Sequence, residues 1–191
     1  MNMRTIADFE EKLIDFLWDK FEKDSTIKSI IKDKNQIVLN SPIDEMKGGL
    51  SLFLYQINEN IFLRNQNFQE TNPKTIQSSP LFLSLFYLIT PTTDNPFNDH
   101  ILLSKILQLI HDNSQLKLSF KDGTNDFTNE RFNLIMNDLT IDEMNKIWSI
   151  LSSSKPYKLS ISLEVTPIKI ESSKSTEFKE VEEVEFKYYL R

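Results

Sequence analysis

The chain has 191 residues, a net charge of -6 at pH 7 and no cysteine. The lack of cysteine excludes disulfides, thiolate zinc sites and cysteine nucleophiles. An acidic chain without a basic block argues against a nucleic-acid partner, because Lys and Arg contacts to phosphates supply most of that affinity.

The first residues of the chain do not have the pattern of an export signal. Charges at Asp8, Glu10, Glu11 and Lys12 interrupt any apolar segment there. The longest apolar runs also fall short of the ~20 residues that a membrane-spanning helix needs. We therefore expect a chain that is made and folded in the cytoplasm, without a membrane partner.

Helix and strand signals alternate in the first half of the chain. Apolar residues recur at helical spacing over 5–21 and predict an amphipathic helix. We expect a short strand at 36–40 and a longer one at 50–57. The polar stretch 65–79 predicts a long loop. The run LFLSLFYLIT at 81–90 lies between two prolines and is nearly all apolar. Such a run is typical of a strand buried on both faces of its sheet.

The next predicted elements are a helix and a hairpin. Apolar residues at helical spacing predict a helix over 98–112, capped by Asn98 or Asp99. The sequence KDGTND then predicts a turn, because Asp-Gly favours the backbone of a tight hairpin. A short strand is expected at 132–136.

A helix and an alternating strand follow. Thr140 and Glu143 form the capping-box pattern for a helix over 140–151, which turns Trp148 inward. Apolar and polar residues alternate over 157–166, as in a half-buried strand. Pro167 shifts that alternation, so we expect a bulge or an edge position there.

The elements together predict one α+β domain. Its sheet is mixed or antiparallel and packs with about three helices. We assign residues 1–170 to this domain and 171–191 to a polar linker and an extended C-terminal arm. The arm alternates apolar residues with polar ones, as a strand does, and its apolar members are Val184, Phe186, Tyr188 and Leu190.

A search for catalytic chemistry finds none. His100 and His111 lie about three turns apart on one predicted helix, too far to share a metal. Glu59 and Arg64 have only amides nearby, whereas a general acid or base needs a partner group. A structural ion pair at a strand end explains these two residues better. We expect no enzyme activity, no metal and no cofactor.

Several blocks follow one another in a distinctive order. After a helical N-terminus come LSLFLYQINENIFLRNQ, PLFLSLFYLIT, DHILLSKILQLIHDN, EMNKIWSIL and YKLSISLEVTPIKI. This order, over about residues 4–170, resembles the cap or tail-terminator proteins of extracellular contractile injection systems, which are phage-tail-like particles. The tail after Glu171 departs from the resemblance.

The resemblance implies a structural protein with a phage tail-terminator-like fold. It implies a homohexameric ring that sits on the last layer of the inner tube and sheath and ends their polymerisation. The partners are then further copies of the chain, the inner tube protein and the sheath protein.

Glu59, Arg64 and Asn65 follow a buried-looking strand, so we expect them to set register with a neighbour or with the tube. The same residues could instead close a loop within one subunit, and the arm 178–191 could pair within its own chain or with a neighbour. The alternative function is a non-catalytic adaptor that binds a soluble protein through its C-terminal strand.

Overall fold

The computed structural model describes residues 6–44, 49–63, 75–77, 79–121, 127–151, 156–172 and 175–177. The elements follow in the order α1 (Ile6–Glu22), α2 (Ser25–Ile30), the 3-10 helix η1 (Lys34–Gln36), β1 (Ile37–Val38), β2 (Leu50–Glu59), β3 (Thr75–Gln77), β4 (Leu81–Pro91), α3 (Pro96–Asp112), β5 (Gln115–Lys121), β6 (Phe127–Asn137), α4 (Ile141–Leu151), β7 (Ile161–Ile170) and β8 (Ser175–Glu177).

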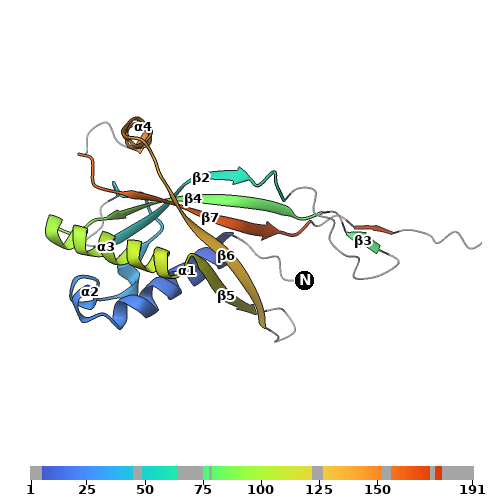
Figure 1. Ribbon diagram of the computed structural model, residues 1–191, viewed down its shortest axis with the longest axis horizontal. Coiled ribbons are helices and arrows are strands. Elements are labelled where there is room, and N and C mark those ends of the chain that lie inside the picture. Colours follow the sequence, from blue (N-terminus) through green and yellow to red (C-terminus); the bar gives the residue numbers. More distant parts are fainter. Residues whose placement is uncertain are drawn as a thin grey trace, which may run out of the picture.

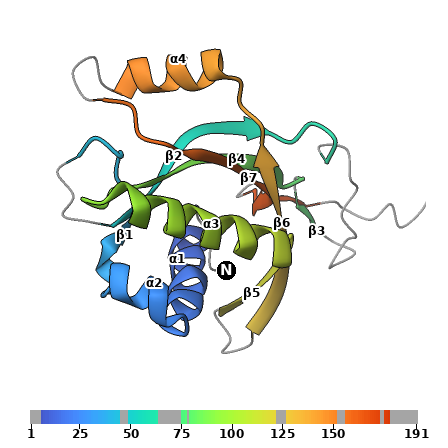
Figure 2. The same cartoon turned by 60° about the vertical axis from the view of Figure 1, so that its left-hand side comes forward.

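A six-stranded sheet in the order β1-β2-β4-β7-β6-β5 organises the fold. The β1–β2 pair is parallel and the other pairs are antiparallel, so the sheet is mixed. Helices α1, α2 and α3 lie on one face of the sheet, and α4 lies alone over the other (Figures 1 and 2). This arrangement confirms the expected single-domain α+β fold.

The main core lies between the sheet and helices α1 to α3. Strand β4 contributes Leu85, Tyr87 and Ile89 to it, all almost fully buried. Phe9 of α1 packs on Phe132 of β6, with ring centroids 5.0 Å apart. The alternate β4 residues face α4, so β4 is buried on both faces, as its nearly continuous apolar sequence predicted.

Local capping signals decide where two helices begin. Helix α3 begins earlier than expected, because the Asn95 side chain accepts a hydrogen bond from the Phe97 N–H at 3.0 Å and Pro96 occupies the first turn. The expected cap at Asn98 or Asp99 is therefore wrong. The capping box of α4 is confirmed: the Thr140 N–H donates to Glu143 at 2.9 Å, and the Glu143 N–H donates to Thr140 at 3.3 Å.

The strands differ from the expected ones mainly in length. The expected strand at 36–40 is a turn of 3-10 helix followed by the two residues of β1. Strand β6 is longer than predicted, because its first half pairs with β5 in the hairpin. Strand β7 begins only at Ile161, which leaves Tyr157 and Leu159 half-exposed before it.

Pro167 behaves as its sequence position predicted. The register of β4 against β7 shifts between Leu83 and Leu85, opposite this proline. The pairing of β6 with β7 ends at Thr166. A residue without an N–H is tolerated at this point because no further β6 residue needs that donor.

A second, two-stranded sheet pairs β3 with β8 in antiparallel register, Ile76 opposite Thr176. These strands lie within the segments expected as a loop and a linker. Their three residues each are too short for a periodic signal, so the pairing with a distant segment decides their structure.

Candidate interaction surfaces

The end of β2 is fixed by the polar residues that interrupt its apolar sequence. The backbone N–H of Asn60 donates to the Phe82 carbonyl at 2.8 Å. The Asn60 side-chain amide donates to the Thr166 hydroxyl oxygen at 3.1 Å, and the Ser84 hydroxyl donates to the same oxygen at 3.0 Å. Asn60 thus ties the end of β2 to β4 and β7 within the chain.

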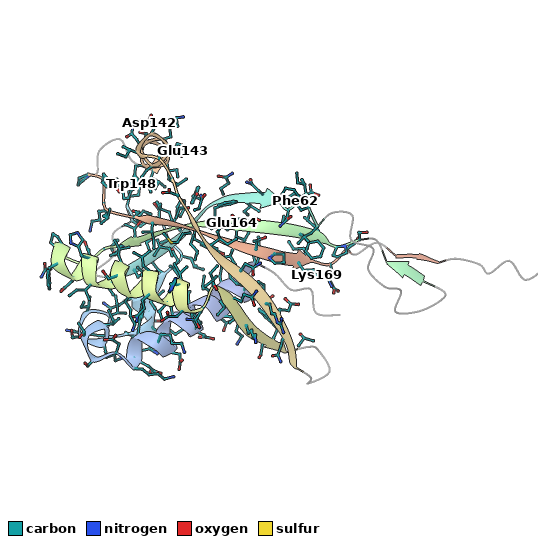
Figure 3. All side chains as sticks on the ribbon, in the orientation of Figure 1. Phe62, Asp142, Glu143, Trp148, Glu164 and Lys169 are labelled. Atoms are coloured by element: carbon teal, nitrogen blue, oxygen red, sulfur yellow. The ribbon has the colours of Figure 1, made fainter. Side chains whose placement is uncertain are left out.

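Beyond this anchor the chain exposes large apolar side chains. Ile61 is 64% exposed and Phe62 is 89% exposed, immediately after the β2 strand that ends at Glu59. Leu81 at the start of β4 is also exposed. We call Glu59, Ile61, Phe62 and Leu81 the β2 tip; Figure 3 shows Phe62 at the end of this strand. Adjacent exposed apolar residues mark an interaction site better than scattered ones do.

A second apolar surface lies on α4. Trp148 of α4, labelled in Figure 3, is 6% exposed. It packs edge-on against Tyr157, with ring centroids 5.4 Å apart. Ile141 and Ile150 on the same helix are 88% and 86% exposed. We call Ile141, Ile150, Tyr157 and Leu159 together the α4 surface, although the helical period places Ile141 and Ile150 on opposite sides of the helix. Trp148 is buried as expected, but it lies across the sheet from the main core cluster.

A polar network holds the strands beneath this side of the sheet. The Tyr55 hydroxyl lies 2.9 Å from the Ser162 hydroxyl, and the Asn137 amide donates to both, at 3.1 and 3.2 Å. Asn137 is the last residue of β6, shortly before α4. The network therefore fixes the place where the chain leaves the sheet to form α4.

The described residues offer little for catalysis. Among them, no group of three or more His, Cys, Asp or Glu could hold a metal ion. His100 and His111 are both exposed on α3. None of the helices in this part of the chain is long and apolar enough to span a membrane.

One half-buried acid pairs with a buried phenol. The Tyr87 hydroxyl donates to Glu10 at 3.1 Å. Burial raises the pKa of Glu10, and the hydrogen bond from Tyr87 partly offsets this. Burial, with the nearby Glu10 charge, also raises the pKa of Tyr87 far above its usual range. The pair joins α1 to the sheet, away from both exposed surfaces, which fits a structural role.

The predicted site residues are only partly placed. Glu59 is exposed at the end of β2, and its contact with a neighbour stays a prediction. Arg64 and Asn65 lie outside the described residues, as do all the arm residues, Val184, Phe186, Tyr188 and Leu190. The sequence reasoning missed Ile61 and Phe62 as surface residues, although their position directly after three polar residues was the available signal.

The apolar tip, the mixed sheet and the lone outer helix can be compared with known proteins. The sequence profile of the Pvc16 N-terminal domain matches residues 13–183. The chain belongs to the Pvc16 N-terminal domain family. A comparison with curated protein sequences finds no match.

Two solved cryo-EM structures share the fold of this Pvc16 N-terminal domain. One is the PVC sheath/tube terminator of an extracellular contractile injection system in its extended state, with a TM-score of 0.63 and 15% identity over 100% of this chain. The other is the anti-feeding prophage cap, a tube terminating cap, with a TM-score of 0.63 and 18% identity over 98% of this chain.

The matched chains are longer than this one. The alignment covers 65% of the PVC terminator chain and 63% of the anti-feeding prophage cap. The chain thus spans less than two thirds of either structural neighbour. Together with the family match, the two neighbours confirm the resemblance to caps and terminators of contractile injection systems.

Proposed function

We propose that this chain is a structural cap that forms a homohexameric ring and ends the inner tube and sheath of a contractile injection system. The observation that carries the proposal is the family match over 13–183, whose two fold neighbours are both terminators. The role needs no cofactor and no reaction. Its partners are further copies of the chain, the tube protein and the sheath protein.

The exposed surfaces suit such a role. Contacts around a ring are heterologous, so each subunit needs two different surfaces for its neighbours and a further one for the tube or sheath. The β2 tip lies at the end of strands that extend beyond helices α1 and α3, and the α4 surface lies on the other side of the sheet (Figure 1). We assign the β2 tip to contact with the tube or sheath.

Residues outside the described part complete the proposal. Arg64 and Asn65 follow the β2 tip in sequence, so we assign them to the same contact as Glu59. We assign the arm residues to contact with a neighbour or the sheath, where alternating side chains supply specificity to a strand added to another sheet.

Particle length tests this function. Particles would be assembled with the wild-type chain, without it, and with Phe62→Asp, and their lengths measured by negative-stain microscopy. We expect uniform particles with the wild type, and tubes and sheaths of irregular length in the other two cases. Phe97→Asp is the matched control, because Phe97 is also exposed but lies at the start of α3. Uniform particles assembled without the chain would contradict the proposed function.

A further inference from the structure

Two cations face one another on the β5–β6 hairpin. Lys117 of β5 lies directly opposite Arg131 of β6 in the antiparallel register, and both side chains are exposed. Like charges directly opposite one another destabilise a strand pair. Among the described residues, no carboxylate lies within ion-pair distance of either cation.

Other lysines of the chain do find carboxylates. Lys34 pairs with Asp15, and Lys105 pairs with Asp24 at 3.0 Å. Lys117 and Arg131 differ from these lysines because each faces another cation in the strand register and not a carboxylate.

Protection of the sheet edge explains only half of this pair. β5 is one of the two edge strands of the six-stranded sheet, and an exposed lysine on an edge strand discourages pairing with other chains. This reasoning accounts for Lys117. It does not account for Arg131, because β6 is an inner strand between β5 and β7.

The C-terminal end of β6 is acidic. Asp138 follows β6, and Asp142 lies in the first turn of α4 beside the 88% exposed Ile141. Both carboxylates are exposed, and neither forms an ion pair with a described residue. Helix α4 follows the C-terminal end of β6, whereas the pairing of β5 with β6 extends toward the other end of the strand (Figures 1 and 2).

The two charged ends are too far apart to neutralise each other within one chain. At about 3.3 Å per residue, the strand from Arg131 to Asn137 alone spans about 20 Å. Charges in solvent are largely screened beyond about 8 Å at physiological ionic strength. A second copy can instead bring its acidic end directly to the cation pair.

We propose that Lys117 and Arg131 of one copy contact Asp138 and Asp142 of the next copy, with Ile141 packed at the same contact. The inference rests on the proposed ring and names its contact surfaces. The contact joins two different surface regions of the subunit, so in the proposed ring each copy uses one region for each of its two neighbours.

Charge reversal with mixing tests this contact. One variant carries Lys117→Glu and Arg131→Glu, and the other carries Asp138→Lys and Asp142→Lys. In each, like charges then meet at every contact, so we expect rings, counted by native mass spectrometry, to need more than about tenfold higher concentration. An equimolar mixture restores complementary contacts and gives rings in which the two variants alternate.

Two further variants control for folding and for the change in net charge. Asp138→Asn with Asp142→Asn removes the charges without placing lysine at a helix start, and an unchanged melting temperature shows that each variant folds. Lys23→Glu with Lys32→Glu changes the net charge by the same amount as the Lys117→Glu and Arg131→Glu variant. These two exposed lysines follow helices α1 and α2, away from the proposed contact, so we expect rings like those of the wild type.

The outcomes separate the contact from the function. Wild-type rings that neither charge-reversal variant weakens would overturn this inference and leave the proposed cap intact. A wild-type chain that stays monomeric, both alone and on tube ends, would overturn the proposed function and the inference together.

Discussion

The side-chain amide of Asn60 donates a hydrogen bond to the Thr166 hydroxyl, 3.1 Å away, across 106 positions of the sequence. This contact joins the end of β2 to the central strand β7. The contact explains why an amide follows a largely buried strand: the Asn60 side chain forms a hydrogen bond within its own subunit. The exposed Ile61 and Phe62 come directly after this anchored residue.

We expect Asn60→Ala to lower the free energy of unfolding by about 1 kcal/mol, because it removes one hydrogen bond at a half-buried position. Urea denaturation of the purified chain measures this. Asn58→Ala is the control, since the Asn58 side chain is exposed and its amide oxygen accepts only from nearby Gln56. Equal midpoints for both variants would show that the Asn60 contact does not stabilise the strand end.

Trp148→Ala should lower the free energy of unfolding by about 3 kcal/mol, because it removes a large buried ring and its contact with Tyr157. Ile150→Ala on the same helix should change it by less than about 0.5 kcal/mol, since that side chain is exposed. Thermal melts of both variants measure the difference. A Trp148→Ala melting temperature equal to the wild type would contradict the burial of this residue beneath α4.

Glu10 should make stability fall as the pH rises. Burial raises its pKa above the ordinary 4.5, so the folded chain binds this proton more tightly than the unfolded chain does. The stabilisation is fully present below the ordinary pKa and is lost as the pH rises through the raised value. Glu10→Gln cannot titrate, so its stability relative to the wild type should increase between about pH 4 and about pH 7. Urea midpoints across this range measure it, and a constant difference would count against the raised pKa.

Gly49→Ala should destabilise the chain strongly. A Cβ at position 49 would lie 2.3 Å from the Gln36 carbonyl oxygen, which is a backbone atom and cannot rotate away. The Gly49 carbonyl also accepts a hydrogen bond from the Thr92 N–H at 2.8 Å. We expect a loss of at least about 1 kcal/mol in urea denaturation. Wild-type stability in this variant would mean that β2 can move away from Gln36.

The sequence predicted the elements whose signals are local. The helical spacing of α1, the capping box at Thr140 and the apolar run of β4 each identified an element within a few residues of its observed bounds. The fold class followed from their order. The short helix α2 was missed, because six residues give too little periodicity.

Features that depend on distant pairing were not predictable in the same way. The strand pair β3–β8 forms between two polar segments about a hundred residues apart. The exposure of Phe62 and Ile141 depends on where the sheet ends and on α4 lying alone over one face. An apolar residue in a sequence does not reveal whether anything covers it.

The copy number and position of this chain in an assembled particle test the central claim most directly. Cryo-EM of the particle end distant from the target-binding apparatus measures both. We predict one ring of six copies, seated on the last layer of the inner tube and sheath, with the β2 tip turned toward them. A ring of three or twelve copies, or a chain located elsewhere on the particle, would contradict the account.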